Sequence, residues 1–466
     1  MVKALVQKYK KPIILSVFLA AVVIVLVSLL IYRHHRQLSS LEKRSTTSSL
    51  VSNWRTFAEN NGCALGEEEY SAIHRQLAPF GFSLDNSAFN DNHTKQENLI
   101  INEQSVYDST FINGTRRDGT IFQLESDGSI QMLEEDYKGR SHPARMIHSY
   151  LESIAHLLPR NITMSFTLAD EPYILPRQPT TDQNPEDTEA ALPTTNTGPL
   201  AESIFDSATC SDASENLRQY RHMHGYFHNE MQVLPYMAPV FSMTTITNCF
   251  RDLVFPAFHM QDDKPIPENQ LVPWQQKREA LFWRGGTTGA PTSSMETFME
   301  SHRPRFIKHA TTRASNPDLV PIDAKFSGIP EQFDADWFTS EYGEVGRSPY
   351  EEHWKFKYLM VIDGWSFNSR LQTFLSSGSL IFRVGVFDEW FEDYIVPMVH
   401  YVPVRLDLSD LDEKLEWARS NDAEARQIAE RARELALRLL HPGQHKCFAS
   451  RLLIEYDALY DKNFAG

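Results

Sequence analysis

The sequence is poor in cysteine and has no excess of positive charge. Each of these two shortages excludes a class of site or partner. Its 466 residues include four cysteines with no CxxC spacing, so zinc-ribbon and thioredoxin-like sites have no support. Lysine and arginine number 45 against 61 aspartate and glutamate residues, which gives a formal net charge of −16. The phosphates of a nucleic acid would repel such a chain, and we therefore exclude a nucleic-acid partner.

The cysteines are Cys63, Cys210, Cys249 and Cys447. An even number permits disulfides in an oxidising compartment, and we predict a Cys210–Cys249 bond, with buried free thiols as the alternative. At 41% hydrophobic and 23% charged residues the chain is globular rather than disordered. Its length exceeds one ordinary core, which predicts two globular domains with appendages.

An apolar segment near the N-terminus, Ile13–Ile31, predicts a membrane anchor. At a rise of about 1.5 Å per residue it nearly spans a hydrocarbon core of roughly 30 Å. A cleaved signal peptide is the alternative, but its apolar region has only about 7–15 residues and ends in small residues. Here the basic run Tyr32–Arg36 follows. The segment therefore fits an uncleaved helix better.

Charge around this segment predicts its orientation. More lysines precede it than arginines closely follow it, which assigns residues 1–12 to the cytosol and residues 32–53 to a luminal stem. The expected location is a single-pass type II protein of the Golgi or ER membrane with a luminal body. Sequons that become usable there are Asn92, Asn113 and Asn161.

An alternating segment, Ile162–Leu168, predicts a strand that ends just before Asp170-Glu171-Pro172. A carboxylate pair at a strand end is well placed for chemistry, but a capped turn explains the same residues. The residues alone favour the turn. The following stretch, Pro176–Leu200, is rich in Pro, Thr and acidic residues and predicts a disordered loop or linker.

Two further motifs have spacings that metal sites use, but we interpret the histidine pair as a packed structural cluster and the aspartate pair as a chance occurrence. His224 and His228 lie four residues apart, but Gly225 interrupts them and no acidic third ligand is near. Asp334 and Asp336 fit the DxD pattern by which some metal-dependent glycosyltransferases hold a nucleotide sugar. Such a pair arises easily by chance in an acidic chain, so no metal ligand is assigned.

Two glycine-containing turns are the most informative features. Tyr358–Ile362 predicts a buried strand, and Asp363-Gly364 ends it ahead of a helix that opens near Arg370. Strand, turn, helix N-terminus and arginine together predict a phosphate site. The other turn, at residues 284–289, follows the apolar strand at 280–283 and lacks the Lys-Ser/Thr of a P-loop.

More strands follow at the spacing of βαβ units, at residues 379–384 and 399–404. They predict a parallel sheet with a nucleotide-diphosphate site at its carboxyl edge, as in Rossmann-like domains. The stretch Asp422–Leu440 is amphipathic, with Ala425, Ile428, Ala432 and Leu435 on one stripe, and predicts a helix that flanks this sheet.

Together these stretches resemble glycosyltransferase family 90, which includes fungal capsule-associated glycosyltransferases and the Rumi-like protein O-glucosyltransferases. The motifs are LFWRGGTTG (281–289), KYLMVIDGWSFNSR (357–370), SSGSLIF (376–382), EWF (389–391), PMVHYVPV (397–404) and DAEARQIAERARELA (422–436). The resemblance is densest from about Leu217 to Tyr460.

The resemblance implies an α/β fold of GT-B type, with two Rossmann-like domains that face each other across a cleft. It assigns residues 54–255 to an acceptor-side domain and residues 256–466 to a domain that binds the nucleotide sugar. The implied reaction is inverting transfer of xylose or glucose from a UDP-sugar to a glycan or protein hydroxyl, without a cofactor or required metal. The alternatives are a non-catalytic carbohydrate-binding scaffold and a metal-dependent GT-A enzyme.

By the same resemblance, Asp170 becomes the general base, which reverses the interpretation from the residues alone. The implied donor-binding residues are Arg284, Gly285, Gly364, Trp365, Ser366, Phe367, Asn368, Ser369 and Arg370. The turn differs from that of the animal members, which carry Ser at the position of Asn368.

Overall fold

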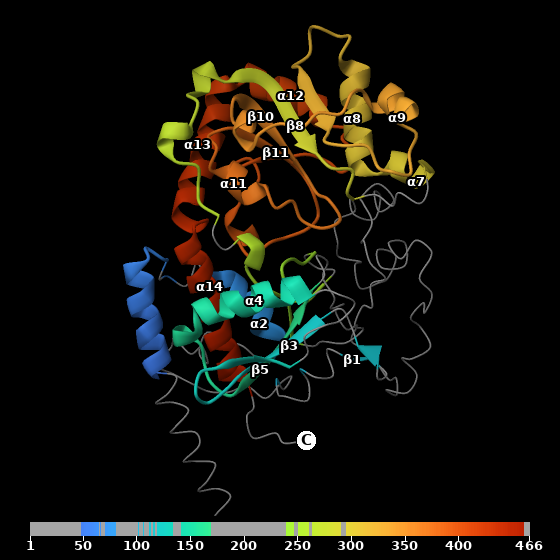
Figure 1. Cartoon of the computed structure of the whole chain (residues 1–466). Coiled ribbons are helices and arrows are strands. Elements are labelled where there is room, and N and C mark those ends of the chain that lie inside the picture. Colours follow the sequence, from blue (N-terminus) through green and yellow to red (C-terminus); the bar gives the residue numbers. More distant parts are fainter. Residues whose placement is uncertain are drawn as a thin grey trace, which may run out of the picture. The chain divides into compact units, whose positions relative to one another are not determined.

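The computed structural model describes residues 48–64, 66, 70–80, 101, 106, 111–112, 115–116, 119–133, 141–168, 239–246, 250–260, 263–289 and 295–460. Contacts divide the chain into two compact units, Met1–Asn53 and Trp54–Gly466. The fold described here is that of the second unit, in which the described strands form two five-stranded sheets and one two-stranded hairpin (Figure 1).

The first sheet is mixed. Its strands, in spatial order, are β4 (Ile130–Met132), β3 (Gly119–Leu124), β5 (Ile162–Thr167), β6 (Val240–Ser242) and β7 (Leu253–Val254). β3 pairs antiparallel with β4 and β5, whereas β5, β6 and β7 run parallel. The expected strand at 162–168 is confirmed, and every residue of β5 is buried. The hairpin consists of β1 (Phe111–Ile112) and β2 (Thr115–Arg116).

The second sheet is entirely parallel, as the sequence predicted. Its strands, in spatial order, are β12 (Val402–Pro403), β11 (Leu380–Val384), β10 (Phe356–Ile362), β8 (Arg278–Gly285) and β9 (Ile322–Phe326). β11 is buried along its whole length, and β10 is buried at every residue except Lys357. Continuous apolar runs of this kind are typical of strands that are covered on both faces.

Alternate side chains of β8 show how the two faces are covered. Trp283 packs edge-on against Phe306 of α8 (His302–Arg313), on one face. Phe282 points to the other face, where it contacts His353 of α10 (Tyr350–His353). On that face α11 (Leu371–Leu375) brings Phe374 against the same histidine. Helices therefore lie on both sides of the sheet.

The remaining helices of the described chain precede, connect or follow these strands. They include α2 (Ser71–Leu77), α4 (Ser141–Ser153), α7 (Met295–Glu300), α9 (Ala335–Tyr342), α12 (Leu411–Ser420), α13 (Asp422–Leu439) and α14 (Pro442–Leu459). α13 confirms the amphipathic helix expected at 422–440, and its apolar stripe is buried. α4 is followed directly by a short turn of 3-10 helix, Ala155–Leu157.

Helix α14 contacts a helix that covers the second sheet and a strand of the first sheet. Near its start, His445 lies edge-on to Trp390 and its Nε2 is 3.1 Å from Oε1 of Gln372 in α11. Near its end, the Tyr456 hydroxyl donates to the carbonyl of Thr163 in β5. Figure 1 shows α14 in red beside the strands of the first sheet. The last helix of the chain thus packs on the sheet that is formed first in sequence.

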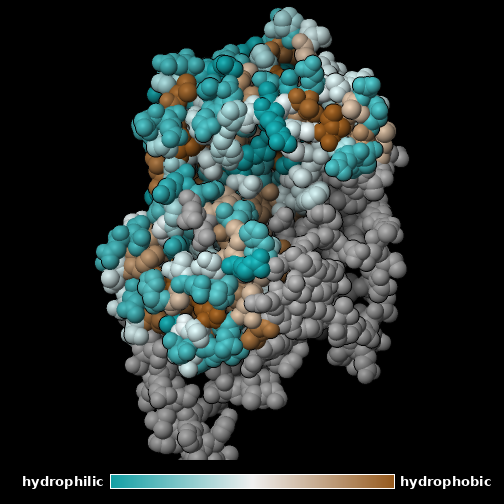
Figure 2. All heavy atoms as spheres, viewed as in Figure 1, coloured by the Kyte–Doolittle hydropathy of each residue, from teal (hydrophilic) through white to brown (hydrophobic). Residues whose placement is uncertain are grey.

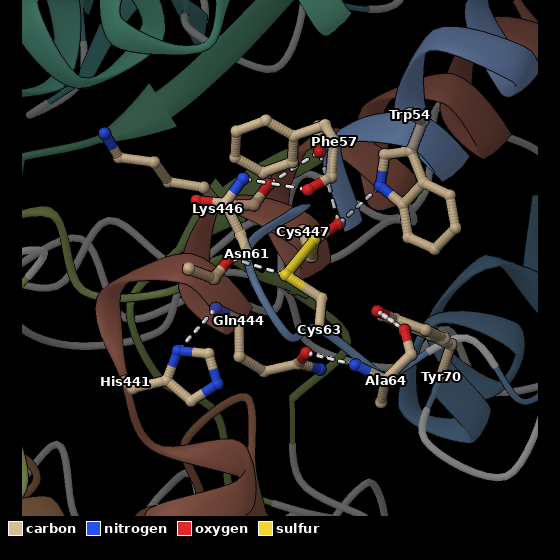
Figure 3. Close-up of a disulfide and its surroundings, with 12 residues drawn as sticks. Trp54, Phe57, Asn61, Cys63, Ala64, Tyr70, His441, Gln444, Lys446 and Cys447 are labelled. Atoms are coloured by element: carbon tan, nitrogen blue, oxygen red, sulfur yellow. Dashed lines mark hydrogen bonds between the residues drawn. A yellow bond between two sulfur atoms is a disulfide. The ribbon is translucent and has the colours of Figure 1, made fainter. Parts of the chain in front are cut away.

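A disulfide between Cys63 and Cys447 joins residues that are 384 positions apart (Figure 3). The Trp54 indole nitrogen donates to the carbonyl of Cys447 at 3.0 Å, and the amide of Ala64 donates to Oε1 of Gln444 at 2.8 Å. The segment around Cys63 is therefore bound to α14 by a covalent bond and by hydrogen bonds. The sequence did not predict this pairing, and the predicted Cys210–Cys249 bond lies outside the described residues.

Several other predictions fall outside the described residues: the anchor Ile13–Ile31, the loop Pro176–Leu200, the histidines His224 and His228, and the sequons Asn92 and Asn113. Within the described part of the chain, none of the helices is both long and apolar enough to cross a membrane. Asn161 is described, and it is exposed at the start of β5 with a φ of 55°.

The domain boundary at residue 255 stays a prediction. The strands of the first sheet end at Val254 and those of the second begin at Arg278, while one compact unit includes both. On the face drawn in Figure 2, hydrophobic residues form small separate groups among hydrophilic ones. The most exposed large apolar side chains of the described residues, Leu437, Met295 and Val396, come from different elements.

Candidate functional site

The order of the second sheet defines the position of the site. After β8 the chain forms β9 on one side of it, and then crosses to form β10 on its other side. The carboxyl ends of β8 and β10 are neighbours. The connection that leaves β8 runs toward β9, and the connection that leaves β10 runs the opposite way, toward β11. In open α/β sheets, ligands bind at such a switch point. Gly285 and Ile362 end these two strands, so the two predicted glycine turns meet there.

The turn after β10 is held by its own hydrogen bonds. The Asn368 side chain donates to the carbonyl of Ile362 at 2.7 Å and accepts from the amide of Arg370 at 3.1 Å. The amide of Gly364 donates to the carbonyl of Ser366 at 2.9 Å. Asn368 and Ser366 are buried, whereas Ser369 is exposed. Asn368 thus shapes the turn and positions Arg370.

The helix expected after this turn is present as α11, but it has only five residues. Such a short helix aligns few peptide dipoles, so it adds little to an anion site. Trp365 and Phe367 are half-buried, and the Phe367 ring stacks on His259, 6.1 Å between centroids. Arg370 is therefore the main positive feature of the turn.

Arg370 lies partly buried at the switch point, where one of its Nη atoms donates to the carbonyl of Arg284. No carboxylate among the described residues forms an ion pair with it. Burial lowers the pKa of Arg370, and the guanidinium nevertheless stays charged because arginine does not lose its proton in proteins. A cation without a counter-ion at this position would attract an anion.

Arg284 is placed differently from what the sequence predicted. Its guanidinium donates to Oδ1 of Asp323 on β9 at 2.7 Å and to the carbonyl of the same residue at 2.9 Å. It also lies 4.3 Å from the centre of the Phe282 ring. The carbonyl of Arg284 therefore contacts Arg370, while its side chain is already neutralised by a carboxylate.

Gly285 has a packing role. A Cβ at this position would collide with the ring of Trp283, so only glycine fits beside that buried indole. This explains the glycine without a ligand. It also leaves the backbone of the β8 turn close to Trp283 and to the face covered by α8.

The sequence missed two residues that join the turns, His302 and Arg303 at the start of α8. The His302 Nε2 atom is 2.6 Å from the carbonyl of Asp363. Arg303 is 5% exposed and donates to acceptors in both turns. Its partners are the carbonyls of Ile362, Asp363 and Gly286 and the hydroxyl of Thr288. No local sequence signal marks these residues, because their partners come from two distant strands.

Asp363 is buried directly behind the β10 turn. Its Oδ2 accepts from the amides of Val386 at 2.8 Å and Phe387 at 3.3 Å. Burial raises the pKa of Asp363 to about 7, against the opposing effect of Arg383. A Cβ at Gly385 would collide with this carboxyl group. Asp363 thus joins the turns after β10 and β11 rather than facing a ligand.

The DxD pattern is explained by a helix cap. Asp334 Oδ1 accepts from the amide of Trp337 at 2.8 Å and caps α9. No group of three or more potential metal ligands occurs in the described residues. The predicted base, Asp170, lies outside them, so its position relative to the turns is not described.

A parallel sheet with glycine turns and, among the described residues, an arginine without a counter-ion at its switch point is typical of proteins that bind nucleotide phosphates. The profile of glycosyl transferase family 90 matches residues 227–464, just over half of the chain and including both turns. The chain belongs to this family, which confirms the resemblance.

Similarity to individual relatives agrees with this family assignment. The chain is 35% identical over 191 residues to the O-glucosyltransferase rumi of Drosophila pseudoobscura pseudoobscura, covering 40% of this chain and 42% of that protein. It is 37% and 27% identical to protein O-glucosyltransferase 1 of Bos taurus and Homo sapiens, over 48% of this chain and 58% of each relative. The chain thus spans about half the length of the curated relatives it matches.

Proposed function

We propose that this protein is an inverting glycosyltransferase that moves a sugar from a UDP-sugar to a hydroxyl group of a protein. The observation that carries the proposal is Arg370, a cation without a described counter-ion at the switch point of a family 90 sheet. The relatives named as O-glucosyltransferases make glucose the first donor to test, and UDP-xylose the second.

In the proposed arrangement the two sheets belong to the two halves of a GT-B fold, and the diphosphate lies against the turns after β8 and β10. Negative charge develops on the UDP as the bond from the anomeric carbon to the diphosphate oxygen breaks. Arg370 and the backbone amides of the turns would stabilise that charge. Asp170 would take the proton of the acceptor hydroxyl as its oxygen attacks the opposite face of the sugar.

Metal independence is part of the proposal. Asp334, one of the two aspartates that a metal-dependent mechanism would use, is engaged as the cap of α9. Transfer should therefore persist in EDTA at its full rate. Complete loss of activity in EDTA that returns with a divalent cation would favour the GT-A mechanism instead.

The direct test is a transfer assay with the full chain, UDP-glucose or UDP-xylose and folded protein acceptors that carry serine hydroxyls. Transfer with inversion, read by the anomeric configuration of the product, supports the proposal. A protein that binds UDP but neither transfers nor hydrolyses any UDP-sugar would be the carbohydrate-binding scaffold.

We also propose a type II topology with the body in the Golgi or ER lumen, based on Ile13–Ile31 and the lysines that precede it. Asn161 is exposed, which leaves room for a glycan in that compartment. Glycosidase treatment of protein expressed in secretory cells should increase its gel mobility, and the Asn161→Gln variant should show a smaller change. Protein of unchanged mobility whose body is digested by protease on the cytosolic side would contradict the topology.

A further inference from the structure

We propose that Arg303 is a positioning residue that holds the β8 turn, Gly286–Gly289, against the β10 turn, Gly364–Arg370, and so sets the affinity for the donor diphosphate. This inference rests on the proposed function, because it assumes that the diphosphate binds at these turns. Arg303 does not touch the ligand in this account. It acts through the backbone of the two turns.

The contacts of Arg303 divide between the two strands that meet at the switch point. Its Nη1 atom donates to the carbonyl of Gly286 at 3.0 Å and to the Thr288 hydroxyl at 2.5 Å, both after β8. Its Nε and Nη2 atoms donate to the carbonyls of Asp363 at 2.8 Å and Ile362 at 3.1 Å, at the end of β10. One planar group thus bridges two turns that are more than 70 residues apart in sequence.

Two glycines show how closely the turns approach. A Cβ at Gly289, where φ is 92°, would lie 2.6 Å from the carbonyl oxygen of Gly364. A Cβ at Gly364 would lie 3.0 Å from the Thr288 hydroxyl and 3.2 Å from Nη2 of Arg303. The turns therefore touch backbone to backbone, and the guanidinium lies at their contact.

The charge of Arg303 also favours an anion. No carboxylate among the described residues forms an ion pair with it, and its hydrogen-bond acceptors are all neutral. Burial, followed by repulsion from Arg370, lowers the pKa of Arg303, against the opposing effect of the buried Asp363 carboxyl group. The guanidinium groups of Arg303 and Arg370 repel each other beside this pair of turns. A diphosphate bound on the solvent side of the turns would stabilise both positive charges.

Lysine cannot replace this geometry. Its ammonium is a point charge with three donors on one atom, whereas the arginine fork reaches acceptors on two sides. The variant Arg303→Lys therefore keeps the charge and loses the bridge. Arg313→Lys is the matched control, since Arg313 ends the same helix and is tied to the carbonyl of Val320 and to Asp412. Over about ten residues, α8 separates the two by roughly 15 Å.

The experiment measures UDP affinity by calorimetry and melting temperature for the wild type, Arg303→Lys, Arg313→Lys and Arg370→Ala, together with the KM for the UDP-sugar. We expect Arg303→Lys to weaken UDP binding at least about 10-fold and to raise the KM in parallel. Arg313→Lys should lower the melting temperature to a similar extent and bind UDP as the wild type does.

Arg370→Ala separates failure of the inference from failure of the proposed function. If Arg370→Ala binds UDP as tightly as the wild type, the donor site lies elsewhere and the proposed function is wrong. If Arg370→Ala loses affinity while Arg303→Lys does not, Arg303 is only a structural residue. Equal losses of UDP affinity in Arg303→Lys and Arg313→Lys would also contradict the inference, because general destabilisation would then explain the loss in Arg303→Lys.

Should Arg303→Lys not fold, Gly289→Ala tests the same contact with the arginine in place. Its new methyl group would push against the carbonyl of Gly364 and separate the turns. The inference requires at least about a 10-fold loss of UDP affinity in this variant too. Wild-type affinity in folded Gly289→Ala protein would overturn it.

Discussion

Arg370 and Arg284 illustrate how side chains of the same type, expected at the same site, differ in their surroundings. Arg370 has no described counter-ion, whereas the guanidinium of Arg284 is held by Asp323. An anion at Arg284 would have to compete with that carboxylate. The contribution of each arginine to donor binding should therefore differ, although the sequence motif assigns them equally.

We predict that Arg370→Ala weakens UDP binding by about 10- to 150-fold, the equivalent of about 1.5–3 kcal/mol for a hydrogen bond to a charged group. Arg284→Ala should weaken it less. Calorimetric titration with UDP measures both. Arg426→Ala is the control, because Arg426 forms an exposed pair with Glu430 on α13. A larger loss in Arg284→Ala than in Arg370→Ala would reverse this assignment.

A second prediction concerns Asp170, which lies outside the described residues. Asp170→Asn cannot accept the proton of the acceptor hydroxyl, so turnover should fall by about 100-fold or more. UDP affinity and melting temperature should stay near those of the wild type. Steady-state kinetics with a saturating UDP-sugar measure the effect, and Glu171→Gln is the neighbouring control. Near-normal transfer by Asp170→Asn would remove the assignment of the base.

At the scale of elements, α14 connects parts of the chain that the sequence assigns to different domains. It contacts α11 through His445 and β5 through Tyr456, and Cys447 on its buried face bonds to Cys63. The residues around this disulfide are also hydrogen-bonded across it (Figure 3). The disulfide thus fixes the start of α14 to a segment that lies 384 positions earlier in the sequence.

We predict that Cys63→Ser with Cys447→Ser destabilises the protein by about 2–4 kcal/mol, since the bond closes a very long loop of the unfolded chain. The expected result is a lower melting temperature under non-reducing conditions, with UDP affinity unchanged at temperatures where the protein is folded. The reduced wild type serves as the comparison. An unchanged melting temperature in the double variant would show that packing of α14 suffices.

At the scale of the whole molecule, buried histidines make stability depend on pH. Burial lowers the pKa of His445 to about 3 and that of His353 to about 4. In the unfolded chain both groups take up a proton near pH 6.5. Between that pH and their folded pKa values the unfolded state binds more protons, so stability falls as the pH falls.

The prediction is a loss of roughly 2 kcal/mol per histidine between pH 7 and pH 5. His445→Gln should lose less stability than the wild type over this interval, because it has one fewer group to protonate. Thermal unfolding at both pH values measures the difference. Parallel pH dependence in the wild type and His445→Gln would contradict the account.

The sequence by itself determined the features that depend on neighbouring residues. Apolar runs predicted β5, β8, β10 and β11, glycines predicted the turns after β8 and β10, and an amphipathic stripe predicted α13. Family motifs assigned both turns to one predicted donor site. These signals are local, because the residue pattern of a strand, turn or helix extends over only about 20 residues.

Only the tertiary structure decided which distant segments meet. It paired Cys63 with Cys447, brought Arg303 to both turns, turned the Arg284 guanidinium toward Asp323 and placed α14 on the first sheet. Strand order is the physical reason at the site, since β8 lies between β9 and β10 and its turn meets residues that follow it by many positions. Such contacts arise from packing across elements, and no periodicity within one segment specifies them.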